Sequence, residues 1–186
     1  MLERSAENFV IESCYWKEKL ARIAKLLNRT KRPKRWTERQ LCSTERDIMI
    51  GFFIIRRMNE LFKTTKSVRE ATVPVYSCKN TGKKVTFRNQ YDLAEIYDVE
   101  NEKKEDNKLA YVCNQFIHCT TSFLFRDETR NWSDVYIVSD FDKQNCIWRV
   151  PVAEIREIFL RVSADYPHSF RMEWNPKKGD YDLSTE

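Results

Sequence analysis

Apolar residues recur at helical spacing near the N-terminus. This stripe predicts a long amphipathic helix over about residues 5–28, and it consists of Phe9, Trp16, Leu20, Ile23 and Leu27. Pro33 cannot continue a helix and disfavours helical geometry at Arg32, so the helix should end before it.

A second helical stripe follows at once. Thr37 with Gln40 three residues later matches a capping box, and Ser43 or Thr44 offers an alternative start. The apolar positions then cover more than one side, which indicates a buried, central helix: Ile48, Phe52, Ile54, Ile55, Met58, Leu61 and Phe62. The two N-terminal helices could pack as an antiparallel pair.

Three more stretches indicate helices. Residues 90–97 suggest a short one, and apolar residues from Leu109 to Cys119 predict a longer one. Pro151 suits the first turn of a further helix, which Pro167 should stop.

The β-rich runs predict a hairpin and a meander. Residues 72–78 and 84–87 flank a turn with Gly82, so we expect a β-hairpin, and Pro74 suggests an edge strand. The charged segment 100–107 has no apolar anchor and is interpreted as an exposed loop. An antiparallel three-stranded meander is expected from residues 122–126, 135–139 and 146–150.

This order of elements favours an α+β fold with an antiparallel sheet in one domain over residues 1–186. We expect a helical N-terminal part (1–64), a mixed part of hairpin, helix, meander and helix (65–164), and an extended tail (165–186).

Composition narrows the class of protein. The chain has 186 residues, 41% hydrophobic and 33% charged, which is typical of a globular domain. Its six cysteines include no CxxC pair and are interpreted as reduced thiols. The first residues carry carboxylates where a signal peptide needs an apolar stretch, and the longest apolar run is too short to span a bilayer. We therefore expect a cytoplasmic protein that does not enter a membrane.

The positive charge is confined to one end. Residues 1–36 hold ten Lys and Arg against four Asp and Glu, whereas the rest of the chain is nearly balanced. The excess is densest in the basic loop, 29–36, whose candidate contact residues are Arg29, Lys31, Arg32, Lys34, Arg35 and Trp36. Lys and Arg can neutralise phosphates and an indole can stack on a base, but a solvated loop or a protein contact explains the same residues.

The tail has an alternating pattern. Phe170, Met172 and Trp174 are two residues apart and would share one face of an extended strand, which either closes the sheet or docks on a partner. Internal packing is the ordinary use of such residues.

Recognisable catalytic and metal-binding patterns are missing. Three glycines cannot supply a Walker loop or a dinucleotide fingerprint. Cys113, His118 and Cys119 form only a partial zinc set with the wrong spacing, and His168 lies outside any nucleophile motif. We therefore expect no metal and no cofactor.

The sequence favours a non-catalytic protein-interaction or regulatory module whose partner is another protein. Sequence-nonspecific nucleic-acid binding through the basic loop is the first alternative, and an enzyme of unrecognised type is the second. The oligomeric state stays open.

Overall fold

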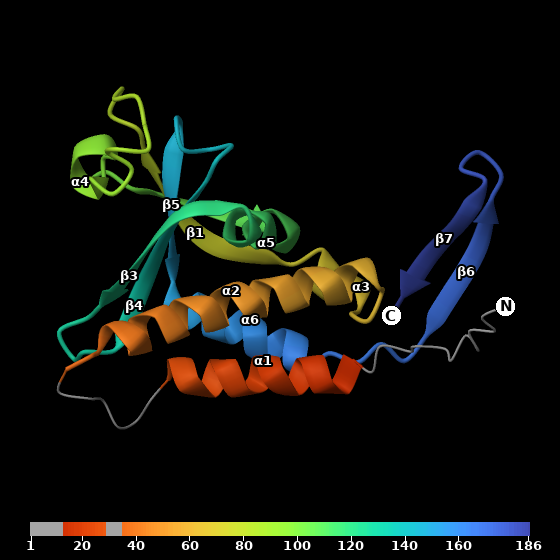
Figure 1. The fold of residues 1–186 in the computed structure, drawn as a ribbon. Coiled ribbons are helices and arrows are strands. Elements are labelled where there is room, and N and C mark those ends of the chain that lie inside the picture. Colours follow the sequence, from red (N-terminus) through yellow and green to blue (C-terminus); the bar gives the residue numbers. More distant parts are fainter. Residues whose placement is uncertain (1–12, 29–34) are drawn as a thin grey trace, which may run out of the picture.

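The computed structural model describes residues 13–28 and 35–186, and Figure 1 shows the order of its elements. The helices are α1 (Ser13–Leu27), α2 (Glu38–Glu60), α3 (Lys66–Arg69), α4 (Leu93–Ile96), α5 (Leu109–Ile117) and α6 (Val152–Ala164). The strands are β1 (Thr72–Lys79), β2 (Lys103–Lys108), β3 (Cys119–Arg126), β4 (Trp132–Ser139), β5 (Cys146–Pro151), β6 (Phe170–Asn175) and β7 (Asp180–Thr185).

Five strands form an antiparallel sheet in the order β2-β1-β5-β4-β3. The predicted meander is confirmed, because β3, β4 and β5 pair in sequence. Helices and a mostly antiparallel sheet in one chain confirm the α+β class. β6 and β7 pair only with each other and make a separate two-stranded sheet.

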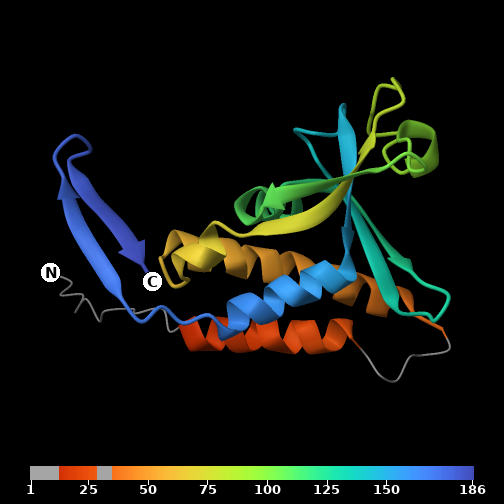
Figure 2. The same cartoon turned by 180° about the vertical axis from the view of Figure 1, so that it is seen from behind.

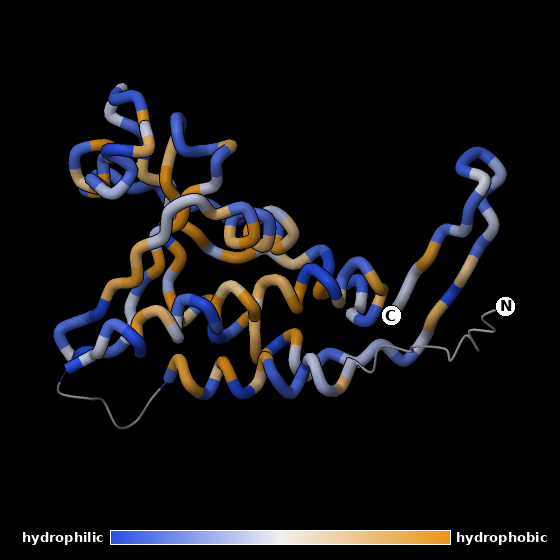
Figure 3. Tube along the Cα trace, in the orientation of Figure 1, coloured by the Kyte–Doolittle hydropathy of each residue, from blue (hydrophilic) through white to orange (hydrophobic). Residues whose placement is uncertain are grey.

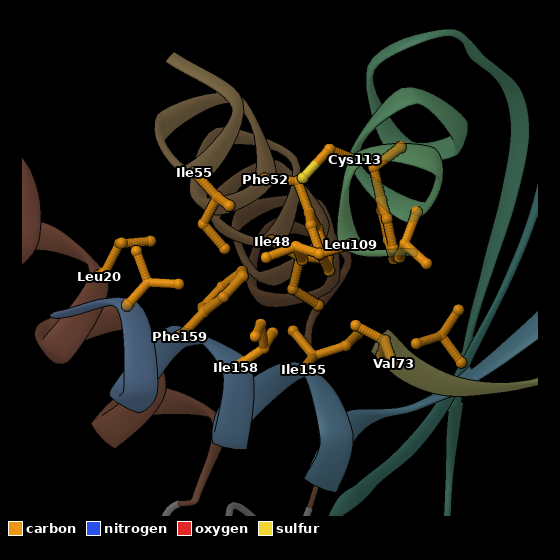
Figure 4. Close-up of a cluster of buried hydrophobic side chains, with 14 of the residues drawn as sticks. Leu20, Ile48, Phe52, Ile55, Val73, Leu109, Cys113, Ile155, Ile158 and Phe159 are labelled. Carbon is orange, nitrogen blue, oxygen red and sulfur yellow. The ribbon is translucent and has the colours of Figure 1, made fainter. Parts of the chain in front are cut away.

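The main core lies between the helices and one face of the sheet. α1, α2 and α6 run side by side below the sheet, and α5 packs against α2 (Figures 1 and 2). Phe52 of α2 stacks on Phe116 of α5 with ring centroids 3.9 Å apart, and the edge of Phe159 from α6 meets it at 5.2 Å. Figure 4 shows Phe52 and Phe159 among the apolar side chains that converge from the helices and from strand β1.

A smaller core covers part of the opposite face of the sheet. Cys78, Val138 and Ile147 of the sheet pack against Ile96 and Tyr97 from the segment between β1 and β2. The hydroxyl of Tyr97 donates to the carbonyl of Lys143 at 2.8 Å. This segment is thereby fastened to the turn between β4 and β5.

The predicted N-terminal helix pair is confirmed over the described residues, and α1 and α2 run antiparallel (Figure 1). Helix α2 begins with the predicted capping box, in which Thr37 and Gln40 exchange side-chain to backbone hydrogen bonds. The predicted first part of the N-terminal helix, residues 5–12, lies outside the described residues.

Lys17 joins three helices. Its ammonium group is buried, donates to the carbonyls of Lys63 at 2.9 Å and of Asp165, and lies 4.0 Å from the centre of the Tyr166 ring. These carbonyls follow the C-terminal ends of α2 and α6, where helix dipoles favour a cation. Burial lowers the pKa of Lys17, while the Asp165 carboxylate opposes that shift.

The predicted hairpin of residues 72–78 and 84–87 is wrong. β1 pairs instead with β2 and β5, and residues 84–87 form no strand. Val85 is the one buried residue of this loop and packs in the smaller core. The β-rich composition of residues 84–87 therefore reflects one buried contact and not a paired strand. β1 is not an edge strand either, but Pro74 lies where β1 is paired with β2 alone, beyond the stretch paired with β5.

The exposed-loop interpretation of residues 100–107 is also wrong, because this segment contains most of β2. β2 is an edge strand with largely exposed or half-buried residues, so it lacks the apolar alternation that marks other strands. Polar contacts replace an apolar face, for example the Ser77 hydroxyl donating to Glu105 at 2.8 Å.

None of the helices in residues 13–28 and 35–186 is long and apolar enough to cross a membrane.

Candidate contact surfaces

The C-terminal hairpin of β6 and β7 has one apolar face. The register pairs Met172 with Leu183 and Trp174 with Tyr181, and residues opposite each other share a face of the sheet. The rings of Trp174 and Tyr181 meet edge to face with centroids 5.2 Å apart. Phe170, Met172 and Trp174 are 57%, 53% and 56% exposed, so the body, as far as residues 13–28 and 35–169 form it, leaves more than half of these three side chains uncovered.

The opposite face and the tip of the hairpin are polar (Figure 3). Asn175 closes the turn by accepting the backbone N–H of Gly179 at 3.0 Å, and Gly179 has a φ of 64° that favours glycine. The Lys178 ammonium pairs with the Asp182 carboxylate at 2.5 Å. This hydrogen bond raises the pKa of Lys178 and lowers the pKa of Asp182.

The base of the hairpin is fixed to the body. Thr185 is buried and donates to the carbonyl of Thr64 at 2.6 Å, while the Arg69 guanidinium donates to the Thr185 hydroxyl. Just before β6, the Asp165 carboxylate accepts the backbone N–H and the hydroxyl of Thr65 at 2.7 and 2.8 Å. The tip therefore projects from a firm base, and the hairpin stands apart from the body in both views (Figures 1 and 2).

The described end of the basic loop packs against the turn between β3 and β4. Trp36 lies against Trp132 with ring centroids 4.4 Å apart, and its indole N–H donates to the carbonyl of Arg130 at 3.1 Å. Arg126 lies 5.7 Å from the Trp132 ring. Arg35, Arg126 and Arg130 are exposed, so the turn adds cations close to the described end of this loop.

Four predicted loop residues, Arg29, Lys31, Arg32 and Lys34, lie outside the described residues. A surface hollow of about 510 Å³ borders Phe125, Arg126, Asp127 and Arg130. Trp36 was the residue predicted to stack on a base. Its ring is half-buried and already packs on Trp132, so only part of the ring is open to a base.

A third surface is the apolar groove between α2 and α5. Its volume is about 420 Å³, and its lining residues are Met49, Ile50, Phe53, Phe116, Ile117 and Cys119. Phe53 is half exposed, although the Trp16 ring approaches it to 6.5 Å between centroids.

Four of the cysteines are unsuited to nucleophilic chemistry at neutral pH. All six are free thiols. Burial raises the pKa of Cys113 and of Cys146 to about 12, and the pKa of Cys78 and of Cys119 to about 11, which keeps these thiols protonated. His118 is exposed at the end of α5 whereas Cys113 is buried, and the described residues contain no group of three His, Cys, Asp or Glu that could hold a metal ion.

Asp142 is the most densely bonded buried carboxylate among the described residues. It accepts from the Tyr111 hydroxyl at 2.6 Å, the Gln115 amide at 2.7 Å and the Trp148 indole at 3.3 Å. Burial and the Asp142 carboxylate raise the pKa of Tyr111. The space beside Tyr111, Gln115 and Trp148 has an accessible volume of 0 Å³, so this network ties α5 to the sheet and leaves no room for a substrate.

A second polar network lies on the other face of the sheet. Arg149 donates to both oxygens of Glu102 and to Asp134, and its guanidinium lies 3.9 Å from the centre of the Tyr76 ring. The hydrogen bonds that Arg149 donates to Glu102 and Asp134 raise the pKa of Arg149, so its charge is permanent and already paired.

Sequence reasoning found one strand of the hairpin and missed the other. Tyr181 and Leu183 alternate with polar residues after the turn that ends at Gly179, and this alternation was the available signal. The contact of Trp36 with Arg130 and Trp132 is a tertiary contact with no local signal. Comparison with protein families, curated proteins and solved structures gives no match.

Proposed function

We propose that this chain is a non-catalytic protein-interaction module whose contact surface is the apolar face of the C-terminal hairpin. The observation that carries this proposal is that Phe170, Met172 and Trp174 are each more than half exposed on one face of a strand. Aromatic residues and Met are enriched at the cores of protein interfaces. The cytoplasm is the proposed location, because all six cysteines are free thiols.

Energetics support this use of the hairpin. Burying apolar surface contributes about 25 cal/mol per Å², and a single aromatic side chain can bury roughly 150–250 Å². Within the described residues more than half of the surface of Phe170, Met172 and Trp174 is still exposed. Phe53 beside the groove between α2 and α5, in contrast, already has the Trp16 ring 6.5 Å away between centroids. An isolated two-stranded hairpin is marginally stable in water, and a partner would add the missing layer.

The test exchanges the three apolar residues for threonine, a residue that suits strands: Phe170→Thr, Met172→Thr and Trp174→Thr together. The native chain should bring down a defined partner and the triple variant should lose it, with an unchanged circular-dichroism spectrum. Phe141→Thr is the control, because Phe141 is an even more exposed aromatic residue, at 87%, in the turn between β4 and β5. If the triple variant captures the partner as well as the native chain does, the hairpin is not the contact surface. If native mass spectra show only a monomer without a partner, the chain is not a protein-interaction module.

Nucleic-acid binding is a second candidate, favoured by one observation. The hydrogen bond from Trp36 to Arg130 brings the exposed Arg126 and Arg130 to the described end of the basic loop. Binding to a random oligonucleotide should weaken steeply as salt rises, because phosphate contacts release counterions. Arg126→Ala with Arg130→Ala should lower the salt slope by about two. No binding at low salt would exclude this candidate.

A further inference from the structure

The hairpin has a strand edge that faces away from the body. Ser169 and Glu186 exchange backbone hydrogen bonds at 3.2 and 3.4 Å. Because paired residues alternate in an antiparallel ladder, Phe170, Met172 and Trp174 direct their backbone N–H and C=O groups to the opposite edge. No strand of the described residues pairs there, and β6 lies on the outer side of the hairpin in Figures 1 and 2.

We propose that β6 pairs antiparallel with β6 of a second copy of this chain, about a twofold axis at Met172. Two hairpins then form one four-stranded sheet, in the order β7-β6-β6-β7. The inference rests on the proposed function of the hairpin as a protein contact element, and it assigns the free edge of β6, beside the apolar face, to a second copy of the chain.

Charge selects this register among the central ones. The outward backbone groups permit twofold pairings centred on residue 171, 172 or 173. Centring on Arg171 places two arginines opposite each other, and centring on Glu173 does the same with two glutamates. Centring on Met172 instead places each Arg171 opposite Glu173 of the partner subunit, and cross-strand pairs of opposite charge stabilise a sheet.

The same register matches the apolar face. Phe170 pairs with Trp174 of the partner subunit twice, and Met172 pairs with Met172 of the partner subunit. Cross-strand aromatic pairs stabilise antiparallel sheets, and both aromatic pairs join the rings of Trp174 and Tyr181 on one surface.

Of the other strands at sheet edges, β7 and β2 are poor alternatives. β7 has Asp180 and Asp182 on its polar face and no cation, so pairing with itself would bring acidic residues together. β2 carries charged residues along its length, which is a common protection of edge strands. β6 combines a full apolar face with one cation and one anion, which makes it self-complementary.

The contact is small. It joins five residues of each strand, from Phe170 to Trp174, and is well below the roughly 1,600 Å² of a standard interface, so dimerisation should depend on protein concentration. Sedimentation velocity over a series of concentrations should show a monomer that converts to a dimer.

Charge exchange tests the register. Arg171→Glu places Glu opposite Glu at two positions, and Glu173→Arg places Arg opposite Arg, so each single variant should weaken dimerisation roughly tenfold. The double variant Arg171→Glu with Glu173→Arg restores both opposite-charge pairs and should dimerise like the native chain. An equimolar mixture of the two single variants should form a heterodimer.

A native chain that stays monomeric at every concentration would overturn the proposal, and so would single variants that dimerise like the native chain. Slow exchange of the Met172 amide in such a monomer would show that the edge is occupied within the chain. If the chain stays monomeric but the triple threonine variant loses a different protein, the proposed function stands and only the second copy is wrong.

Discussion

The body and the C-terminal hairpin contain the same kinds of residue in opposite environments. Phe52, Phe116 and Phe159 are fully buried where α2, α5 and α6 meet, whereas Phe170 and Trp174 on β6 are more than half exposed. In both regions the apolar positions recur regularly, at helical spacing in the helices of the body and at a spacing of two on β6. The difference teaches that a pattern specifies which face of an element is apolar but not what covers that face.

Truncating one aromatic residue in each region tests this difference between buried and exposed rings with the largest expected effect. Phe159→Ala should lower the free energy of unfolding by about 3–5 kcal/mol, because it removes a fully buried ring and leaves a cavity. Trp174→Ala should lower it by less than about 1 kcal/mol, because the ring loses mainly its contact with Tyr181. Urea unfolding at low protein concentration measures both, and equal losses would place the hairpin in the folding core.

The contact between α2 and α6 gives a second prediction. Exchanging Gly for Ala within a helix ordinarily stabilises it by about 1 kcal/mol, but a Cβ at Gly51 would lie 2.2 Å from the Phe159 ring. We expect Gly51→Ala to destabilise the protein by about 1–3 kcal/mol through overpacking. Combining it with Phe159→Leu should recover part of the loss. A stabilised Gly51→Ala variant in thermal unfolding would show that the helices are not in this close contact.

The smallest effect concerns pH. Glu45 on α2 accepts a hydrogen bond from the Ser122 hydroxyl, and burial raises its pKa. A raised folded pKa means that the neutral form is favoured in the folded protein. The stability from this group is full below the unfolded pKa and is lost as pH rises through the folded pKa.

Glu45→Gln keeps an acceptor for Ser122 and removes the charge. It should therefore raise the free energy of unfolding at pH 7 by less than about 1 kcal/mol, with the difference vanishing in acid. Glu157→Gln on the exposed side of α6 is the control. A Glu45→Gln variant that loses stability at pH 7 would contradict burial as the dominant cause.

Much of the helical fold could be predicted because its signals are local. The capping box at Thr37, the apolar stripe of α2 and the proline before α6 all act within a few residues. The meander followed from three β-rich runs with short connections.

β2 could not be predicted, because its evidence is not local. Its residues are charged, its pairing with β1 crosses the whole segment that carries α4, and an edge strand needs no apolar face. For residues 84–87 the error was the opposite one, because a strand was predicted where there is none. Their strand-like composition corresponds to a loop with one buried residue, Val85.

The candidate contact surfaces also have one part that the sequence could predict and one part that it could not. Phe170, Met172 and Trp174 were identifiable by their spacing of two, although internal packing was the more ordinary use for them. Their exposure depends on β7 being their sole neighbour among the described strands, which only the three-dimensional arrangement shows. Arg130 joins the basic loop through its hydrogen bond with Trp36, a contact between residues 94 positions apart.

Amide hydrogen exchange along β6 at low and high protein concentration tests the central claim most directly. Arg171 and Glu173 bond to β7 and serve as internal references, whereas the amides of Phe170, Met172 and Trp174 face outward. The outward amides should exchange rapidly at low concentration and slow down as concentration rises, with the references and the body nearly unchanged. Exchange of the outward amides that is slow and independent of concentration would contradict an open contact edge.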